Sequence, residues 1–134
     1  MAQDTKAAKP RIDLDPQGPI TFKRDVRIPT PDGAELVLPV VFKYRDREAV
    51  AALFDRYREE AEAEIAKPGR PVDQSVRDAI ESDVKTLRDL MDGWGLAYPF
   101  DDAHLRLLCV RYAGSALAIV TDYRVSLTSG RLGN

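Results

Sequence analysis

The chain has 134 residues, of which 44% are hydrophobic and 31% are charged, and its formal net charge is −2. These values are typical of one folded domain, too short for two hydrophobic cores and too apolar for a disordered chain. A small negative net charge argues against nucleic acid as a partner, because binding phosphates needs a clustered surplus of Lys and Arg. No apolar run approaches the roughly 20 residues that span a bilayer, so no membrane partner is expected.

Residues 1–19 are polar, include three prolines and show no periodicity. We therefore predict a flexible N-terminal tail over residues 1–19 and a single α+β domain over residues 20–134. In the alternative interpretation this tail orders on a partner, with Ile12 and Leu14 as weak anchors. The tail has no hydrophobic segment of the signal-peptide type. A single cysteine excludes an internal disulfide, which fits a reducing compartment such as the cytoplasm.

Two strands are predicted at residues 20–28 and 36–44, on either side of a turn-rich segment at residues 29–33. Their apolar residues occupy alternate positions, interrupted only by Arg24. These residues are Ile20, Phe22, Val26 and Ile28 in the first strand, and Leu36, Leu38, Val40, Phe42 and Tyr44 in the second. Pro39 cannot donate to a ladder, so the second strand is expected to be an edge strand or to be bulged there. Because a lone hairpin is marginal in water, its apolar face must pack on helices or on a second copy.

A long helix is predicted from about Asp46, its N-cap, to Ala66. Its apolar stripe recurs at spacings of three and four and comprises Val50, Leu53, Phe54, Tyr57, Ala61 and Ile65. The other face carries seven acids against three arginines between Asp46 and Glu64. Such a face is usually only solvated, although a minority contact a basic partner. A Pro-Gly break precedes a second helix, capped by Asp73 or Ser75 and ending near Asp92, and the short connection favours an antiparallel pair.

The last part of the chain is predicted to hold two shorter helices after a compact, aromatic-containing connection at residues 93–99. Asp101 or Asp102 caps the first helix, and Gly114 or Ser115 opens the second. Their apolar positions are Ala103, Leu105, Leu107, Leu108 and Val110, then Leu117, Ile119, Val120, Tyr123 and Leu127. The predicted fold class is therefore α+β, an N-terminal β-hairpin followed by an antiparallel helix pair and two shorter C-terminal helices.

The residue pattern predicts no catalytic, cofactor-binding or metal site. His104 and Cys109 lie five residues apart, which places them about 140° apart around a helix, out of reach of each other. Zinc needs more ligands than one His and one Cys provide. Asp101 and Asp102 are better interpreted as a helix cap than as an acid–base pair. The glycines at residues 93–95 lack the preceding strand and further glycine of a nucleotide-binding loop.

Residues 92–134 resemble the C-terminal region of the tail assembly chaperones of long-tailed bacteriophages and their prophages. The similar features are a Gly-Trp turn at residues 93–94, a capped Leu-rich helix ending at Tyr112, an Ala-rich helix with Tyr123, and a Gly-Arg-Leu-Gly-Asn end at residues 130–134. The strand pair before a charged helix at residues 26–48 also looks like this family. The resemblance therefore covers roughly residues 20–134.

The resemblance implies a role without catalysis. Such chaperones bind the tape measure protein in the host bacterial cytoplasm, keep it soluble, hand it to tail tube subunits and are absent from the finished virion. The expected partners are thus the tape measure and tail tube proteins, with a homo-oligomer as a further expectation. A small acidic helical surface with apolar edges suits the coating of amphipathic segments.

The predicted client surface is the hairpin edge together with exposed parts of the last two helices. Its partner-binding residues are Trp94, Tyr112, Tyr123, Leu127 and Arg131. In the structural interpretation, Trp94 instead plugs a gap between helices with its indole N–H bonded to a carbonyl, and the tyrosines point their rings inward. Two other functions stay open, a minor tail or connector protein of the virion, and a small bacterial regulatory module that binds one folded partner.

Overall fold

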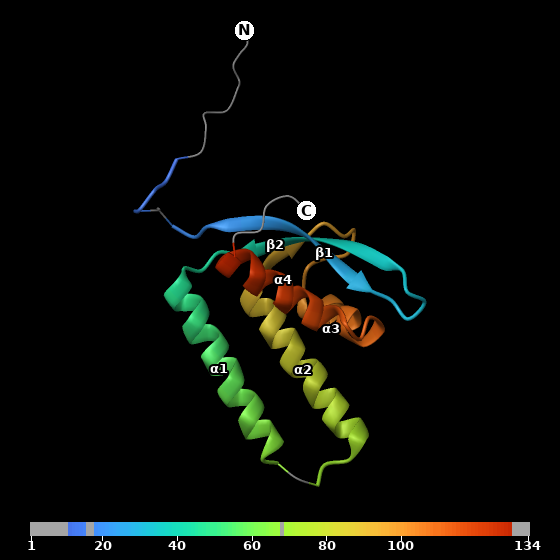
Figure 1. Ribbon diagram of the computed structural model, residues 1–134. Helices are drawn as coiled ribbons and strands as arrows, with labels where there is room; N and C mark the ends of the chain where they lie inside the picture. The colour runs from blue at the N-terminus through green and yellow to red at the C-terminus, as the bar shows by residue number, and fades with distance from the viewer. Residues whose placement is uncertain (1–10, 16–17, 68, 130–134) are drawn as a thin grey trace.

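The computed structural model of the chain describes residues 11–15, 18–67 and 69–129. Within these ranges a three-stranded antiparallel sheet forms one layer, and four helices lie on one side of it (Figure 1). The elements in chain order are β1 (Thr21–Pro29), β2 (Glu35–Lys43), α1 (Arg47–Ile65), α2 (Val72–Leu90), β3 (Met91–Trp94), α3 (Asp102–Arg111) and α4 (Ser115–Ser129). The predicted α+β class, with a hairpin before four helices, is confirmed. The short strand β3 was not predicted.

The hairpin of β1 and β2 runs in one uninterrupted register, from Thr21 opposite Lys43 to Pro29 opposite Glu35. Gly33 in the connecting turn has a φ of 87°, a left-handed conformation that glycine adopts without a Cβ penalty. The predicted alternation is confirmed at the buried residues Val26, Ile28, Leu38, Val40 and Phe42, whereas Ile20, Leu36 and Tyr44 of the same predicted face are exposed. This apolar face packs on helices of the same chain.

The strand β2 lies between β1 and β3, so the prediction that the strand holding Pro39 is an edge is wrong. The β2–β3 ladder pairs Phe42, Val41 and Val40 with β3, and Pro39 follows at its end. There the Pro39 carbonyl accepts a hydrogen bond of 2.9 Å from the backbone N–H of Gly95. Because Pro39 lies at the end of the ladder, its missing N–H removes no internal ladder bond. The irregularity of the ladder falls between Val41 and Phe42 instead.

Tyr123 of α4 lies at the centre of the core and is 0% exposed. Its ring centroid is 5.1 Å from that of Phe42 and 6.2 Å from that of Phe22, on the two hairpin strands. Its hydroxyl donates to the Lys43 carbonyl at 2.8 Å and accepts from the Arg45 guanidinium at 3.0 Å. Burial of a large apolar side chain stabilises a fold by about 1.5–3 kcal/mol. Tyr123 therefore joins α4 to the sheet through both its ring and its hydroxyl.

Arg24 is the charged residue that interrupts the inward-facing apolar positions of β1. Its Nε and Nη2 donate to the two carboxylate oxygens of Asp122 in α4, at 2.8 and 3.3 Å. The two side chains are only 15% and 13% exposed. A buried charge needs a hydrogen-bonded partner of opposite charge, and this bidentate pair supplies it. The pair positions α4 across β1.

The helix starts agree with the predictions for α1, α3 and α4, the last of which begins at Ser115, and differ for α2. Asp46 and Asp101 cap α1 and α3, each side chain accepting a hydrogen bond from the backbone N–H three residues later. The helix α2 instead follows Pro71 with no side-chain cap, so the prediction of Asp73 or Ser75 as its cap is wrong. It ends at Leu90 because the chain continues directly into β3.

Of the predicted tail, residues 11–15 and 18–19 are exposed and belong to no helix or strand, and the rest lies outside the described residues. Among the described helices, none is by itself long and apolar enough to cross a membrane. The helices α3 and α4 pass that test only as a pair, and they are bent by 107° at their junction. Both place apolar residues, Leu105 and Ile119 among them, in the buried core.

Candidate functional site

The helices α1 and α2 form two arms that extend away from the sheet and join at their far end (Figure 1). The connection is short, as predicted, yet the two helices pack little against each other. A groove of about 1310 Å³ lies between them, with residues of α4 at its sheet-proximal side. The molecule therefore has an open recess between the two helices of the predicted antiparallel pair.

The residues of α1 explain why the arms stay apart. Beyond Tyr57, the α1 side chains that line the groove include Glu60, Ala61 and Glu64. Alanine buries little apolar surface and so adds little to the attraction between two helices, and a glutamate at such a contact would lose its hydration. The predicted apolar stripe continues to Ile65, but this residue is 83% exposed. The far half of α1 thus offers no large apolar side chain to fill the space.

The groove is closed at its sheet-proximal end by contacts between the arms. Arg56 of α1 donates to the Asp89 carboxylate of α2 at 2.8 Å, and the Tyr57 hydroxyl donates to the same oxygen at 2.8 Å. Burial, followed by the hydrogen bond to Asp89, raises the pKa of the Tyr57 hydroxyl above its ordinary value. Tyr57 is therefore a neutral donor at any physiological pH.

The far end of the groove is closed by ion pairs around Arg70. This side chain contacts Asp78 of α2 and also Glu64 of α1, the latter at 3.1 Å. Lys67 donates to Glu64 at 3.0 Å, and this bond is the main reason that the pKa of Glu64 lies below its ordinary value. The arms are thus tied together at both ends and separate between them.

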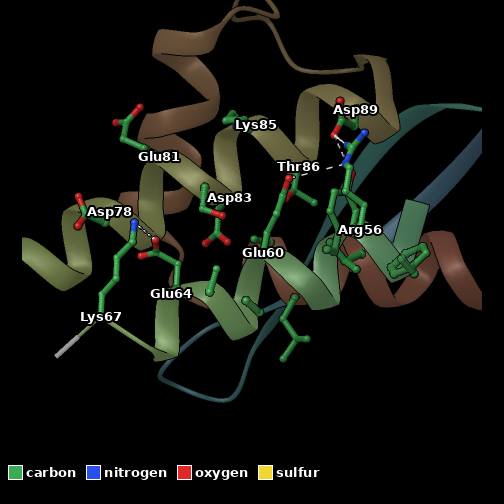
Figure 2. A pocket seen from close by; sticks show the side chains of 18 of the residues that line it. Arg56, Glu60, Glu64, Lys67, Asp78, Glu81, Asp83, Lys85, Thr86 and Asp89 are labelled. Atoms are coloured by element: carbon green, nitrogen blue, oxygen red, sulfur yellow. Dashed lines mark hydrogen bonds and ion pairs between the residues drawn. The ribbon is translucent and has the colours of Figure 1, made fainter. Parts of the chain in front are cut away.

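Asp83 lies in the middle of the groove, and Figure 2 shows its carboxylate pointing from α2 toward α1. No hydrogen bond or ion pair joins Asp83 to another residue in the described part of the chain. Partial burial raises the pKa of this carboxyl above its ordinary value. An aspartate that loses water without gaining a partner is unfavourable in the free protein. A cation placed in the groove would relieve that cost.

Part of the apolar lining of the groove comes from α4 and from Ala113, which precedes this helix. Leu117 and Val120 of α4 line it, and Leu117 is 73% exposed although it belongs to the predicted apolar face. The arms themselves are acidic, with six acids against three arginines in α1 and five acids against three basic residues in α2. Since the whole chain has a net charge of only −2, negative charge is concentrated on the arms.

The structure distributes the predicted partner-binding residues over several environments. Trp94 is partly buried in β3, its ring 5.3 Å from that of Phe100 and its indole N–H donating to the Tyr98 carbonyl at 2.8 Å. Tyr112 and Leu127 are partly buried against the core, and Tyr123 is fully buried. Arg131 lies outside the described residues. The described members of this set do not form one open surface, and their role in binding a partner stays a prediction.

The residues considered for catalysis are also held apart from one another. His104 contacts the Asp101 carboxylate through Nδ1 at 2.8 Å, beside the α3 cap. Cys109 is buried on the same helix, and burial raises the pKa of its thiol to about 11. Such a thiol is protonated at neutral pH and is a poor nucleophile. Within the described ranges, no three His, Cys, Asp or Glu residues cluster closely enough to hold a metal ion.

The groove was not predicted from the sequence because the residues that line it follow the same patterns as core and surface residues of other helices. Ala61 and Leu117 fit the helical apolar stripes that normally form a core, and Asp83 is one acid among many on α2. A useful signal was the composition of the far half of α1, where alanine and glutamate alternate from residue 60 to residue 64. That stretch forms a helix readily but has no large apolar side chains that could pack against a second helix.

The fold and the groove define a small α+β protein with two acidic helical arms and a partly apolar recess between them. Residues 7–134, nearly the whole chain, match the family model described as phage tail assembly chaperone. The chain therefore belongs to the phage tail assembly chaperone family. No curated protein and no solved structure matches the chain.

Proposed function

We propose that this protein is a tail assembly chaperone that binds the tape measure protein, keeps it soluble in the host bacterial cytoplasm and helps to recruit tail tube subunits. The observation that carries the proposal is the family membership of nearly the entire chain. The open groove, with Leu117 exposed in it, supports the proposal because a surface of this kind suits amphipathic client segments. The proposed role involves no catalysis, and the protein leaves the tail before the virion is complete.

Co-expression with the tape measure protein of the same phage or prophage tests this proposal. We expect the tape measure protein to be insoluble when expressed alone and to become soluble and co-purify when this chain is present. A fusion partner of similar size and charge controls for general solubilisation. If the tape measure protein stays insoluble and unbound, the proposed function is wrong.

A further inference from the structure

We propose that the groove between α1 and α2 binds one amphipathic helix of a partner protein, with the helix's apolar side on Leu117 and Val120 and a Lys or Arg beside Asp83. This inference rests on the proposed function and specifies how the client is held. It assigns the binding of the client to the arms, and not to the hairpin edge or to the last two helices alone.

The shape of the groove selects a helix as its occupant. Between the closing contacts at Asp89 and Asp78, α2 extends over eleven residues, or roughly 16 Å at 1.5 Å per residue. Three turns of helix cover this length and present apolar anchors at i, i+3 or i+4, and i+7. Ala61 in the opposite wall permits close approach of a second helix, since a small residue leaves the backbone accessible.

The unpaired Asp83 favours a basic residue on the occupant, because the other charged residues that line the groove, five acids and five bases, balance each other. Both arms have more acids than bases, and the neighbouring ion pairs already engage Glu64, Asp78 and Asp89. Asp83 is the groove carboxylate that is partly buried and, within the described residues, lacks a hydrogen bond or ion pair. A Lys or Arg on the bound helix would pair with it in a site from which water is partly excluded, where such pairs favour correct docking.

Two synthetic peptides of about 20 residues, long enough to form a helix, provide the probe. Both carry leucines at helical spacing on one side, and the other side is lysine-rich in one peptide and glutamate-rich in the other. We expect the lysine peptide to bind the full chain about tenfold more tightly or better. In NMR spectra of the labelled chain, the shifted amide signals should map to the groove, at Ala61, Asp83 and Leu117.

Two matched pairs of variants show whether the groove itself binds. Ala61→Trp fills the groove, whereas Ala52→Trp places the same side chain nine residues earlier, on the opposite side of α1 at 3.6 residues per turn. We expect about a tenfold loss of affinity for the first variant and no loss for the second. Asp83→Asn should weaken the lysine peptide several-fold, and Asp92→Asn, which removes an exposed charge elsewhere, should not. Circular dichroism checks that each variant is folded.

The outcomes separate this inference from the proposed function. If tape measure protein binds the wild type and Ala61→Trp equally well, the groove proposal is overturned while the chaperone function stands. If the peptide binds in the groove but tape measure protein is not bound, the proposed function fails and the helix site remains. If Ala61→Trp changes the oligomeric state in sedimentation without any peptide, the occupant is a second copy and the proposal is overturned.

Discussion

Gly95 and Pro39 touch at the end of the β2–β3 ladder and leave no room for a side chain. A Cβ on Gly95 would lie 2.9 Å from the Cβ and 3.1 Å from the Cγ of Pro39, whose ring cannot rotate away. We therefore expect Gly95→Ala to lower the free energy of unfolding by about 1–3 kcal/mol, measured by urea denaturation. Gly93→Ala is the control, because a Cβ there meets nothing within 4 Å. Equal losses in the two variants would contradict the steric explanation.

Tyr123 was predicted as a partner-binding residue, but its burial and its two hydroxyl hydrogen bonds indicate a structural role. Tyr123→Phe keeps the ring contacts and leaves the Lys43 carbonyl without its donor. We expect a loss of about 1–2 kcal/mol in stability and unchanged affinity for the client. Thermal unfolding and a co-purification assay measure the two effects. Weakened client binding in a variant that is otherwise folded would favour the original prediction.

Asp83 makes stability depend on pH in a direction opposite to most carboxylates. Burial raises the pKa of this group in the folded state above the unfolded value of about 3.9. The free-energy cost of burying the charged carboxylate is therefore absent below the pKa of the unfolded state and fully present above the pKa of the folded state. We expect Asp83→Asn to be more stable than the wild type at pH 7 and to lose this advantage as the pH falls through 4. Thermal melts across this range test it, with Asp92→Asn as the control. An advantage independent of pH would contradict the assignment.

The elements themselves could be predicted where the signal is local. The alternation in β1 and β2 and the caps at Asp46 and Asp101 depend on neighbouring residues only, and the structure confirms them. The strand β3 was missed because four residues including Gly93 show no alternation. The error about Pro39 follows from that omission, since β2 becomes central only when β3 pairs with it.

The groove could not be predicted because periodicity reports that a helix has an apolar face without reporting what covers it. The stripe through Ala61 and Ile65 has the same spacing whether or not α2 packs on it. The same holds for Leu117, which has a core-like position in the sequence and is 73% exposed. Whether two helices pack along their lengths depends on side-chain volumes across the interface, and these become known only when the arms are placed.

The uneven packing of the arms makes a prediction about their local stability. In α1 the buried residues are Val50 and Leu53, both near the sheet, whereas α2 also buries Val84, Leu87 and Leu90. We expect amides from residue 60 to residue 65 to exchange with solvent faster than those from residue 84 to residue 90, because few buried contacts hold that part of α1. Hydrogen–deuterium exchange measures this. A bound lysine peptide should slow exchange at residues 60–65, and equal protection of both arms in the free protein would contradict the prediction.

At the scale of the whole molecule, the two helical arms extend from a core built on the sheet. The sheet, α3, α4 and the sheet-proximal parts of both arms form the core around Tyr123. The arms extend away from this core (Figure 1), and most of their acidic residues are exposed. This division lets the binding surface be polar and partly unfilled while the core supplies stability. Under the proposed function, this combination suits a chaperone that binds tail components during assembly and then leaves them.

Under the proposed function, the size of the groove indicates how a bound copy would leave the tape measure protein. Permanent complexes bury more than about 2,000 Å² of surface, and a contact made by three turns of one helix buries far less. Each bound copy is therefore expected to exchange. Under the proposed function, tail tube subunits that polymerise around the tape measure protein would make many simultaneous contacts and displace single copies. We therefore expect mass spectrometry to detect this chain in tape measure complexes from infected cells and at well below one copy per particle in purified virions. A stoichiometric amount in virions would instead identify a structural tail protein.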